Sequence, residues 1–132
     1  MHIHLIIIGI IFIVLALIHL IFPKYLDWEK ELKSLNLINL QIMKIHTIFI
    51  ALTVFLMGLL CLTSANELIE TNLGRKIIFG FAFFWTIRLI IQFFGYSSKL
   101  WKGKTFETSV HIIFSILWMY ISYIFWIIYF SF

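Results

Sequence analysis

Five side chains that could bind a ligand stand in otherwise apolar stretches of this chain. They are three histidines, one arginine and one glutamine. An arginine in the middle of an apolar helix costs roughly 2.5 to 3.5 kcal/mol on insertion scales, so it usually faces a protein interior or a wet cavity and marks a candidate site. The candidate cofactor-binding residues are His19, His46, Arg88, Gln92 and His111.

Two pairs of these polar residues have a spacing that places both members on one helical face. Arg88 and Gln92 are four residues apart and share their face with Trp85. Glu107 and His111 repeat the four-residue spacing near the start of the last apolar segment. At that distance a carboxylate and an imidazole can bind the same ion or each other.

Histidine nitrogens and a carboxylate are ligands for zinc, iron and copper, so the sequence predicts a metal site of His19, His46, His111 and Glu107. The permanent charge of Arg88 opposes a bare cation in a low dielectric. Haem meets this constraint better, because two histidines can be axial ligands while an arginine pairs with a propionate. A quinone or an anionic lipid headgroup also fits, with the arginine and glutamine as donors and a histidine as proton partner.

The composition decides which environment these residues occupy. Of the 132 residues, 63% are hydrophobic and only 12% are charged. A soluble domain carries about 25% charged residues, so this composition predicts an integral membrane protein. The single cysteine, Cys61, lies in an apolar run and predicts no disulfide framework or CxxC motif. The net charge of +4 lies in lysine-rich loops, which favours contact with lipid headgroups and not with nucleic acid.

The apolar segments predict an all-α single domain over residues 1–132, built as an up-down-up-down bundle of four transmembrane helices. Each segment is long enough, at about 1.5 Å per residue, to cross a hydrocarbon core of roughly 30 Å. Between the first two spans, charged residues alternate with an apolar stripe that includes Trp28. This pattern predicts a short amphipathic helix in the headgroup plane, or alternatively a partner-binding helix. The spans are expected at about 3–22, 41–63, 77–95 and 109–131, the interfacial helix at about 24–36, and a helix stop and restart at Gly74.

The distribution of basic residues predicts the orientation of the protein. Loops one and three with their flanks carry most of the lysines and should be cytoplasmic, with both termini outside, in a bacterial inner membrane. The three histidines, Arg88 and Gln92 then lie at adjacent depths in the cytoplasmic leaflet, where they could converge. The basic residues are Lys24, Lys30, Lys33, Lys44, Lys99, Lys102 and Lys104 on one side and Arg75 and Lys76 on the other.

The last span carries a polar stripe that predicts its buried face. Residues at steps of three, four and seven along one face are polar or aromatic, whereas isoleucines are expected to cover much of the lipid-facing surface. The stripe is Glu107, His111, Ser115, Trp118, Ser122 and Tyr129, and the isoleucines are Ile112, Ile113, Ile116, Ile121, Ile124 and Ile128.

These observations favour a small membrane protein that binds a redox cofactor, haem or a histidine-ligated metal, for electron transfer or a membrane redox reaction with a quinone-like partner. A transporter or channel subunit, or an assembly subunit of a larger membrane complex, would use the same cluster differently. The chain could also form a homo-oligomer. The polar residues could alternatively serve only as interhelical hydrogen bonds, worth about 0.6 kcal/mol each on average. Whether the protein is an enzyme, and which residues would be catalytic, stays open.

Overall fold

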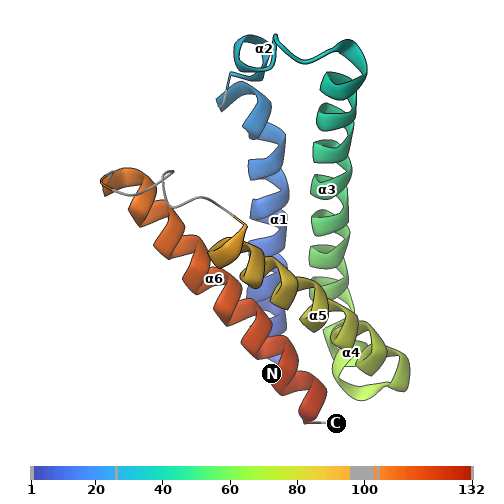
Figure 1. Ribbon diagram of the computed structural model, residues 1–132. Coiled ribbons are helices and arrows are strands. Elements are labelled where there is room, and N and C mark those ends of the chain that lie inside the picture. The colour runs from blue at the N-terminus through green and yellow to red at the C-terminus, as the bar shows by residue number, and fades with distance from the viewer. Residues whose placement is uncertain (1, 26, 96–102, 104, 132) are drawn as a thin grey trace. The chain divides into compact units, whose positions relative to one another are not determined.

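The computed structural model describes residues 2–25, 27–95, 103 and 105–131, and four long helices dominate them (Figure 1). Each of the four is long and apolar enough to cross a membrane. The predicted all-α class with four membrane-length helices is therefore confirmed. The long helices are α1 (His2–Tyr25), α3 (Leu37–Thr63), α5 (Asn72–Phe94) and α6 (Thr105–Phe130).

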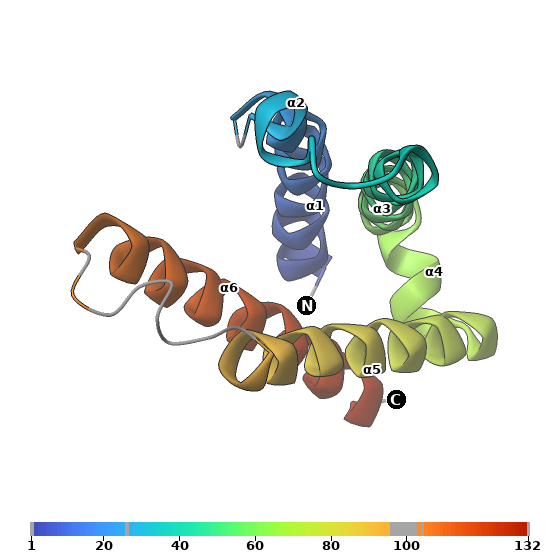
Figure 2. The ribbon, with the colours of Figure 1, turned by 45° about the horizontal axis from the view of Figure 1, so that its top comes forward.

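The chain divides into two compact units, which we call the N-terminal hairpin (His2–Ala65) and the C-terminal hairpin (Asn66–Phe132). In the first, α1 packs against α3, and in the second, α5 packs against α6 (Figures 1 and 2). The two long helices of each hairpin run antiparallel, as the alternating topology predicts. That the two units form one domain and one bundle stays a prediction.

The N-terminal hairpin is held by a close approach of two helix backbones. A Cβ atom built on Gly9 would lie 3.0 Å from the carbonyl oxygen of Gly58, and one built on Gly58 would lie 2.9 Å from the carbonyl oxygen of Gly9. Only glycine at both positions allows this contact, which is how small residues promote helix association in membranes. Buried apolar side chains on α1, including Leu5, Ile8 and Phe12, extend the interface around this point.

The connection between the first two spans contains a short helix, as predicted, but α2 covers only Trp28–Glu31. Two features explain the difference from the expected range of 24–36. First, α1 continues through Pro23 to Tyr25, because a proline in the last turn removes only one backbone hydrogen bond. Second, Asp27 has φ 53° and lies in the left-handed region, which ends regular helix at that point. The location of α2 in the headgroup plane stays a prediction.

A second short helix, α4 (Ala65–Glu70), joins α3 to α5 and was not predicted. The expected restart at Gly74 was wrong by two residues, because α5 begins at Asn72. The hydroxyl of Thr71 accepts a hydrogen bond from the Gly74 backbone N–H at 2.9 Å, so Thr71 is the N-cap of α5 and Gly74 lies within its first turn. A Cβ atom on Gly74 would overlap the backbone of Leu68, so this glycine allows the tight α4–α5 corner.

The predicted polar stripe of α6 is buried at the centre of the helix, and the predicted isoleucine face is exposed only over its first half. Ser115, Trp118 and Ser122 are buried, as expected. Isoleucines near the N-terminal end are exposed, but those near the C-terminal end are buried, so the prediction for the latter was wrong. Because residues three or four apart share a helical face, an isoleucine three positions after Trp118 must lie on the buried side. The exposed residues are Ile112, Ile113 and Ile116, and the buried ones are Ile121, Ile124 and Ile128.

Candidate functional site

Gln92 lies at the centre of a polar cluster between α5 and α6. Its side chain is only 5% exposed. Its carbonyl oxygen Oε1 accepts hydrogen bonds from Nη1 of Arg88 at 3.2 Å and from Nε1 of Trp118 at 3.3 Å. A guanidinium and an indole N–H can only donate, so these two bonds fix which end of the Gln92 amide faces them.

The other end of the Gln92 amide faces His111. Nε2 of Gln92 lies 3.0 Å from Nδ1 of His111 and 3.5 Å from the His111 carbonyl oxygen. An amide nitrogen only donates, so Nδ1 of His111 must accept, and the ring is neutral with its proton on Nε2. The His111 carbonyl also accepts a hydrogen bond from the Ser115 hydroxyl at 2.7 Å.

One tryptophan lies against the arginine, and a second tryptophan stacks on the first. The guanidinium carbon of Arg88 lies 5.0 Å from the centre of the Trp118 ring, within the range of a cation–π interaction. The Trp118 ring stacks on Trp85 with their centres 5.1 Å apart and an interplanar angle of 18°. Both tryptophans are buried. They therefore fix the position of the charge and place an apolar wall beside it.

We call Arg88, Gln92, His111 and Trp118 the Gln92 cluster. The structure brings together three of the five predicted cofactor-binding residues. The contribution of Trp118 as a donor to Gln92 was not predicted. The stripe placed Trp118 on the same face as His111, because seven residues return to the same side of a helix, but this spacing does not indicate the partner of the indole N–H.

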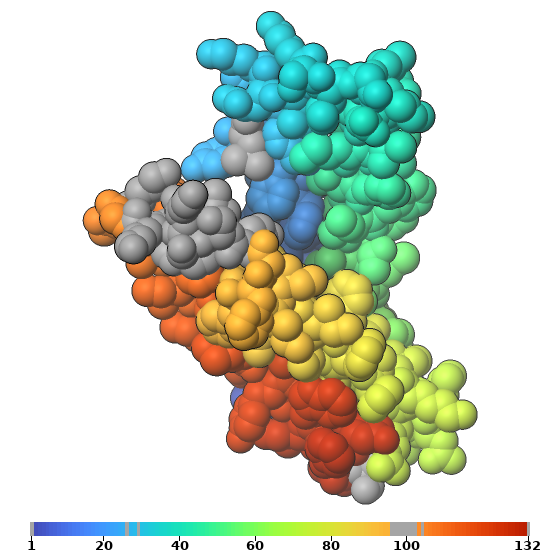
Figure 3. All heavy atoms as spheres, viewed as in Figure 1, coloured from blue at the N-terminus to red at the C-terminus, as the bar shows by residue number. Residues whose placement is uncertain are grey.

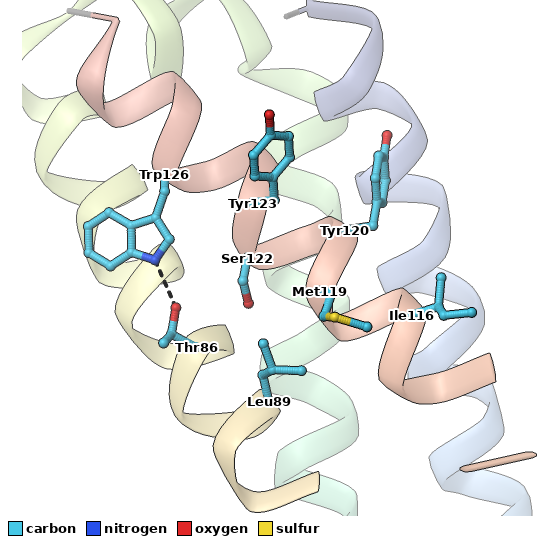
Figure 4. A pocket seen from close by; sticks show the side chains of 8 residues that line it. All are labelled: Thr86, Leu89, Ile116, Met119, Tyr120, Ser122, Tyr123 and Trp126. Carbon is cyan, nitrogen blue, oxygen red and sulfur yellow. Dashed lines mark hydrogen bonds between the residues drawn. The ribbon is translucent and has the colours of Figure 1, made fainter. Parts of the chain in front are cut away.

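An open groove lies on the same hairpin and is lined by residues of α5 and α6 (Figure 4). Its volume is about 620 Å³. The walls are mainly apolar, and a hydrogen bond of 2.8 Å from Nε1 of Trp126 to the Thr86 hydroxyl crosses between the helices. The Ser122 hydroxyl is buried without a hydrogen-bond partner among the described residues. The lining residues are Thr86, Leu89, Ile116, Met119, Tyr120, Ser122, Tyr123 and Trp126.

The other predicted site residues lie apart from the cluster or at its edge. His19 and His46 belong to the N-terminal hairpin, so the convergence of all five residues stays a prediction. His46 and Glu107 are exposed, whereas His19 is partly buried and packs against Phe22 with 5.0 Å between ring centres. The lysines of the third loop, Lys99, Lys102 and Lys104, and Trp101 lie outside the described residues.

The hydrogen bonds of the histidines bear on the predicted metal or haem ligands. Nδ1 of His19 donates to the Leu15 carbonyl at 2.7 Å, so the lone pair of a neutral ring is on Nε2, as in many metal-binding histidines. In His111 the lone pair of Nδ1 is used by Gln92, and Nε2 carries the proton. Within the described residues no three His, Cys, Asp or Glu side chains are close enough to hold one metal ion. The metal site and the haem stay predictions without support from this geometry.

Comparison with protein families, curated proteins and solved structures found no match. The class of the protein therefore follows from the chain itself. It is a small integral membrane protein with four candidate spans, paired as two hairpins, and the second hairpin carries a polar cluster around a buried glutamine.

Proposed function

We propose that the C-terminal hairpin binds a quinone, with the headgroup oxygen at the Gln92 cluster and the tail in the adjacent groove. The observation that carries this proposal is the buried amide of Gln92, which orients the donors of Arg88 and His111 with one side chain. The chain thereby places a permanent cation and a neutral imidazole N–H near each other. Such a pair suits a carbonyl oxygen that needs donors and, on reduction, a proton.

The depth of the cluster favours a quinone over a phospholipid headgroup. With α5 centred in the bilayer, Arg88 lies five residues from the middle of the Asn72–Phe94 helix, which is about 7.5 Å along its axis. The hydrocarbon core extends roughly 15 Å from the midplane, and lipid phosphates stay outside it. A quinone ring can enter that depth, but the phosphate of a lipid would have to leave the interface to reach it.

The groove supports the same ligand class. It extends from Leu89 and Ile116 to Thr86 and Trp126 (Figure 4). Thr86 and Trp126 are farther along α5 and α6 from Gln92 and His111 than Leu89 and Ile116 are. A volume of about 620 Å³ lies within the range typical of small-molecule sites. Its apolar lining matches an isoprenoid chain, so headgroup and tail would each meet the polarity they require.

The test is a titration of the purified full-length protein in detergent with a short-chain benzoquinone, followed by quenching of tryptophan fluorescence. Trp85 and Trp118 are part of the site or touch it, so a bound quinone should quench them strongly. Arg88→Gln should weaken binding about tenfold, the equivalent of about 1.4 kcal/mol. Arg75→Gln is the matched control, because Arg75 lies on the same helix over the Tyr129 ring, 4.7 Å from its centre.

Further measurements separate the alternatives. Leu89→Trp, which fills the groove without changing the cluster, should weaken a long-tailed quinone more than a short one. Equal affinity in the two arginine variants would overturn the proposal. Displacement of the quinone by phosphatidylglycerol would reassign the site to an anionic headgroup. A Soret band lost in His19→Ala, or stoichiometric zinc, iron or copper in the same sample, would instead support the predicted haem or metal centre.

A further inference from the structure

The closed end of the N-terminal hairpin contains a second cavity, of about 310 Å³. It lies where the end of α1, the turn around α2 and the first turns of α3 meet, and the space-filling view shows these segments forming one surface at that end of the hairpin (Figure 3). Unlike the groove on α5 and α6, it is lined by charged residues. The lining residues are Pro23, Lys24, Asp27, Trp28 and Lys44.

The register of the hairpin explains why the two lysines meet. Gly9 contacts Gly58, and the two helices run antiparallel. Fifteen residues along α1 from Gly9 is Lys24, and fourteen residues back along α3 from Gly58 is Lys44. The glycine contact thus places the two lysines at the same level, one on each helix.

The two lysines are not neutralised within the described part of the chain. Lys24 is exposed and Lys44 is partly buried, and neither has an ion pair among the residues that the structure describes. Trp28, only 7% exposed, forms an apolar wall beside them. Lys24 is in the last turn of α1 and Trp28 is in the connection that follows it. Lysine and tryptophan side chains near the end of a membrane-length helix typically contact lipid phosphates and the headgroup region.

Asp27 gives the cavity an acceptor as well. Its side chain makes no capping hydrogen bond to α2, although it occupies the N-cap position, because its backbone is left-handed with φ 53°. Asp27 lines the cavity together with the lysines. A ligand that satisfies all three charges must carry an anion and, a few ångströms away, a hydrogen-bond donor.

We infer that this cavity binds the headgroup of a phospholipid, with the phosphate on Lys24 and Lys44 and the ammonium or hydroxyl donor of the headgroup on Asp27. Phosphatidylethanolamine and phosphatidylglycerol carry such donors, whereas phosphatidylcholine has no N–H or O–H there. The site belongs to the N-terminal hairpin and does not depend on quinone binding by the other one. Lys24 lies in the last turn of α1, so its level matches that of the lipid phosphates, as the level of Arg88 does not.

The test is native mass spectrometry of the full chain in detergent, titrated with each of the three lipids. The double variant Lys24→Gln/Lys44→Gln should bind phosphatidylglycerol about tenfold more weakly. The matched control is Lys30→Gln/Lys33→Gln, which removes the same amount of charge from exposed residues of the connection between α1 and α3, outside the cavity, and should bind as the wild type. Asp27→Asn should reduce the preference for phosphatidylglycerol over phosphatidylcholine. Circular dichroism checks that each variant keeps its helices.

Three outcomes would overturn the inference. Equal weakening in the two double variants would show a general attraction of the basic connection for anionic lipid. Equal affinity of the wild type for phosphatidylglycerol and phosphatidylcholine would show that Asp27 does not bind a headgroup donor. Inorganic phosphate that competes at concentrations comparable to those of the lipid would assign the lysines to free phosphate and not to a lipid.

Discussion

The two helices within each hairpin are held together by different contacts in the N-terminal and the C-terminal hairpin. In the N-terminal hairpin, Gly9 and Gly58 bring two backbones into contact, surrounded by aliphatic side chains. In the C-terminal hairpin, α5 and α6 contact each other through aromatic rings and through the hydrogen bonds of Gln92. Both solutions occur in membrane proteins, where lipid supplies no hydrophobic force between helices.

This difference bears on the role of the polar cluster. The N-terminal hairpin shows that this chain can pair two helices by close packing of small residues. An arginine in the middle of a span is therefore not needed for association, and its insertion is costly. The hydrogen bonds of Gln92 join α5 and α6, whereas the proposed quinone site would give the costly charge of Arg88 a role.

The largest effect should come from the glycine contact. Gly58→Ala places a Cβ atom 2.9 Å from the Gly9 carbonyl oxygen and 3.0 Å from Cδ1 of Ile13, so the helices must separate. We expect a loss of about 1 to 3 kcal/mol in the free energy of unfolding, typical of overpacking. The measurement is unfolding in mixed micelles followed by circular dichroism.

The control is Gly80→Ala in the other hairpin. A Cβ atom there has no neighbour within 4 Å, so alanine should be tolerated or stabilise α5 by up to about 1 kcal/mol through its higher helix propensity. If both variants unfolded alike, the glycine contact would not be what holds the N-terminal hairpin.

Gln92→Leu tests whether the polar cluster also stabilises the C-terminal hairpin. The substitution keeps the approximate volume but removes the acceptor that Arg88 and Trp118 share. Each interhelical hydrogen bond contributes about 0.6 kcal/mol, and buried donors that lose their acceptor add a further cost. We therefore expect the free energy of unfolding to fall by about 2 kcal/mol. The same micelle titration measures it.

The natural control for that change is Gln41→Leu. Gln41 is the other glutamine of the chain and is exposed near the start of α3, so its replacement should change the stability little. Equal stability of the Gln92 variant and the wild type would mean that the cluster contributes nothing to association, and that its retention depends on the ligand alone.

The sequence was informative where the helical period alone decides the outcome. Arg88 and Gln92 are one turn apart on any α-helix, so their hydrogen bond follows from spacing. Comparing depths in antiparallel spans placed Gln92 and His111 at adjacent levels, but it did not predict the contact between them. The four spans followed from length and apolar composition.

The remaining features depend on tertiary register, which no local pattern contains. The sequence does not indicate that Gly9 meets Gly58, or that Lys24 consequently lies opposite Lys44. The left-handed backbone of Asp27 is equally a property of the connection as a whole. The tautomer of His111 is fixed only by a partner on another helix, so the ligand chemistry of this residue could not be decided from its type.

The smallest effect on stability is expected for the hydrogen bond between Trp126 and Thr86, which joins α5 and α6 outside the Gln92 cluster. Thr86→Val keeps the shape of the side chain but removes the acceptor of the 2.8 Å bond from Trp126, and we expect a loss of about 0.6 kcal/mol. A double-mutant cycle with Trp126→Phe isolates this pairwise term. The matched control is Thr53→Val in the N-terminal hairpin, because the Thr53 hydroxyl donates to the Phe49 carbonyl of its own helix. A coupling energy near zero for Thr86 and Trp126 would show that aromatic packing joins this part of the C-terminal hairpin, and the polar contribution to its association would then come from the Gln92 cluster.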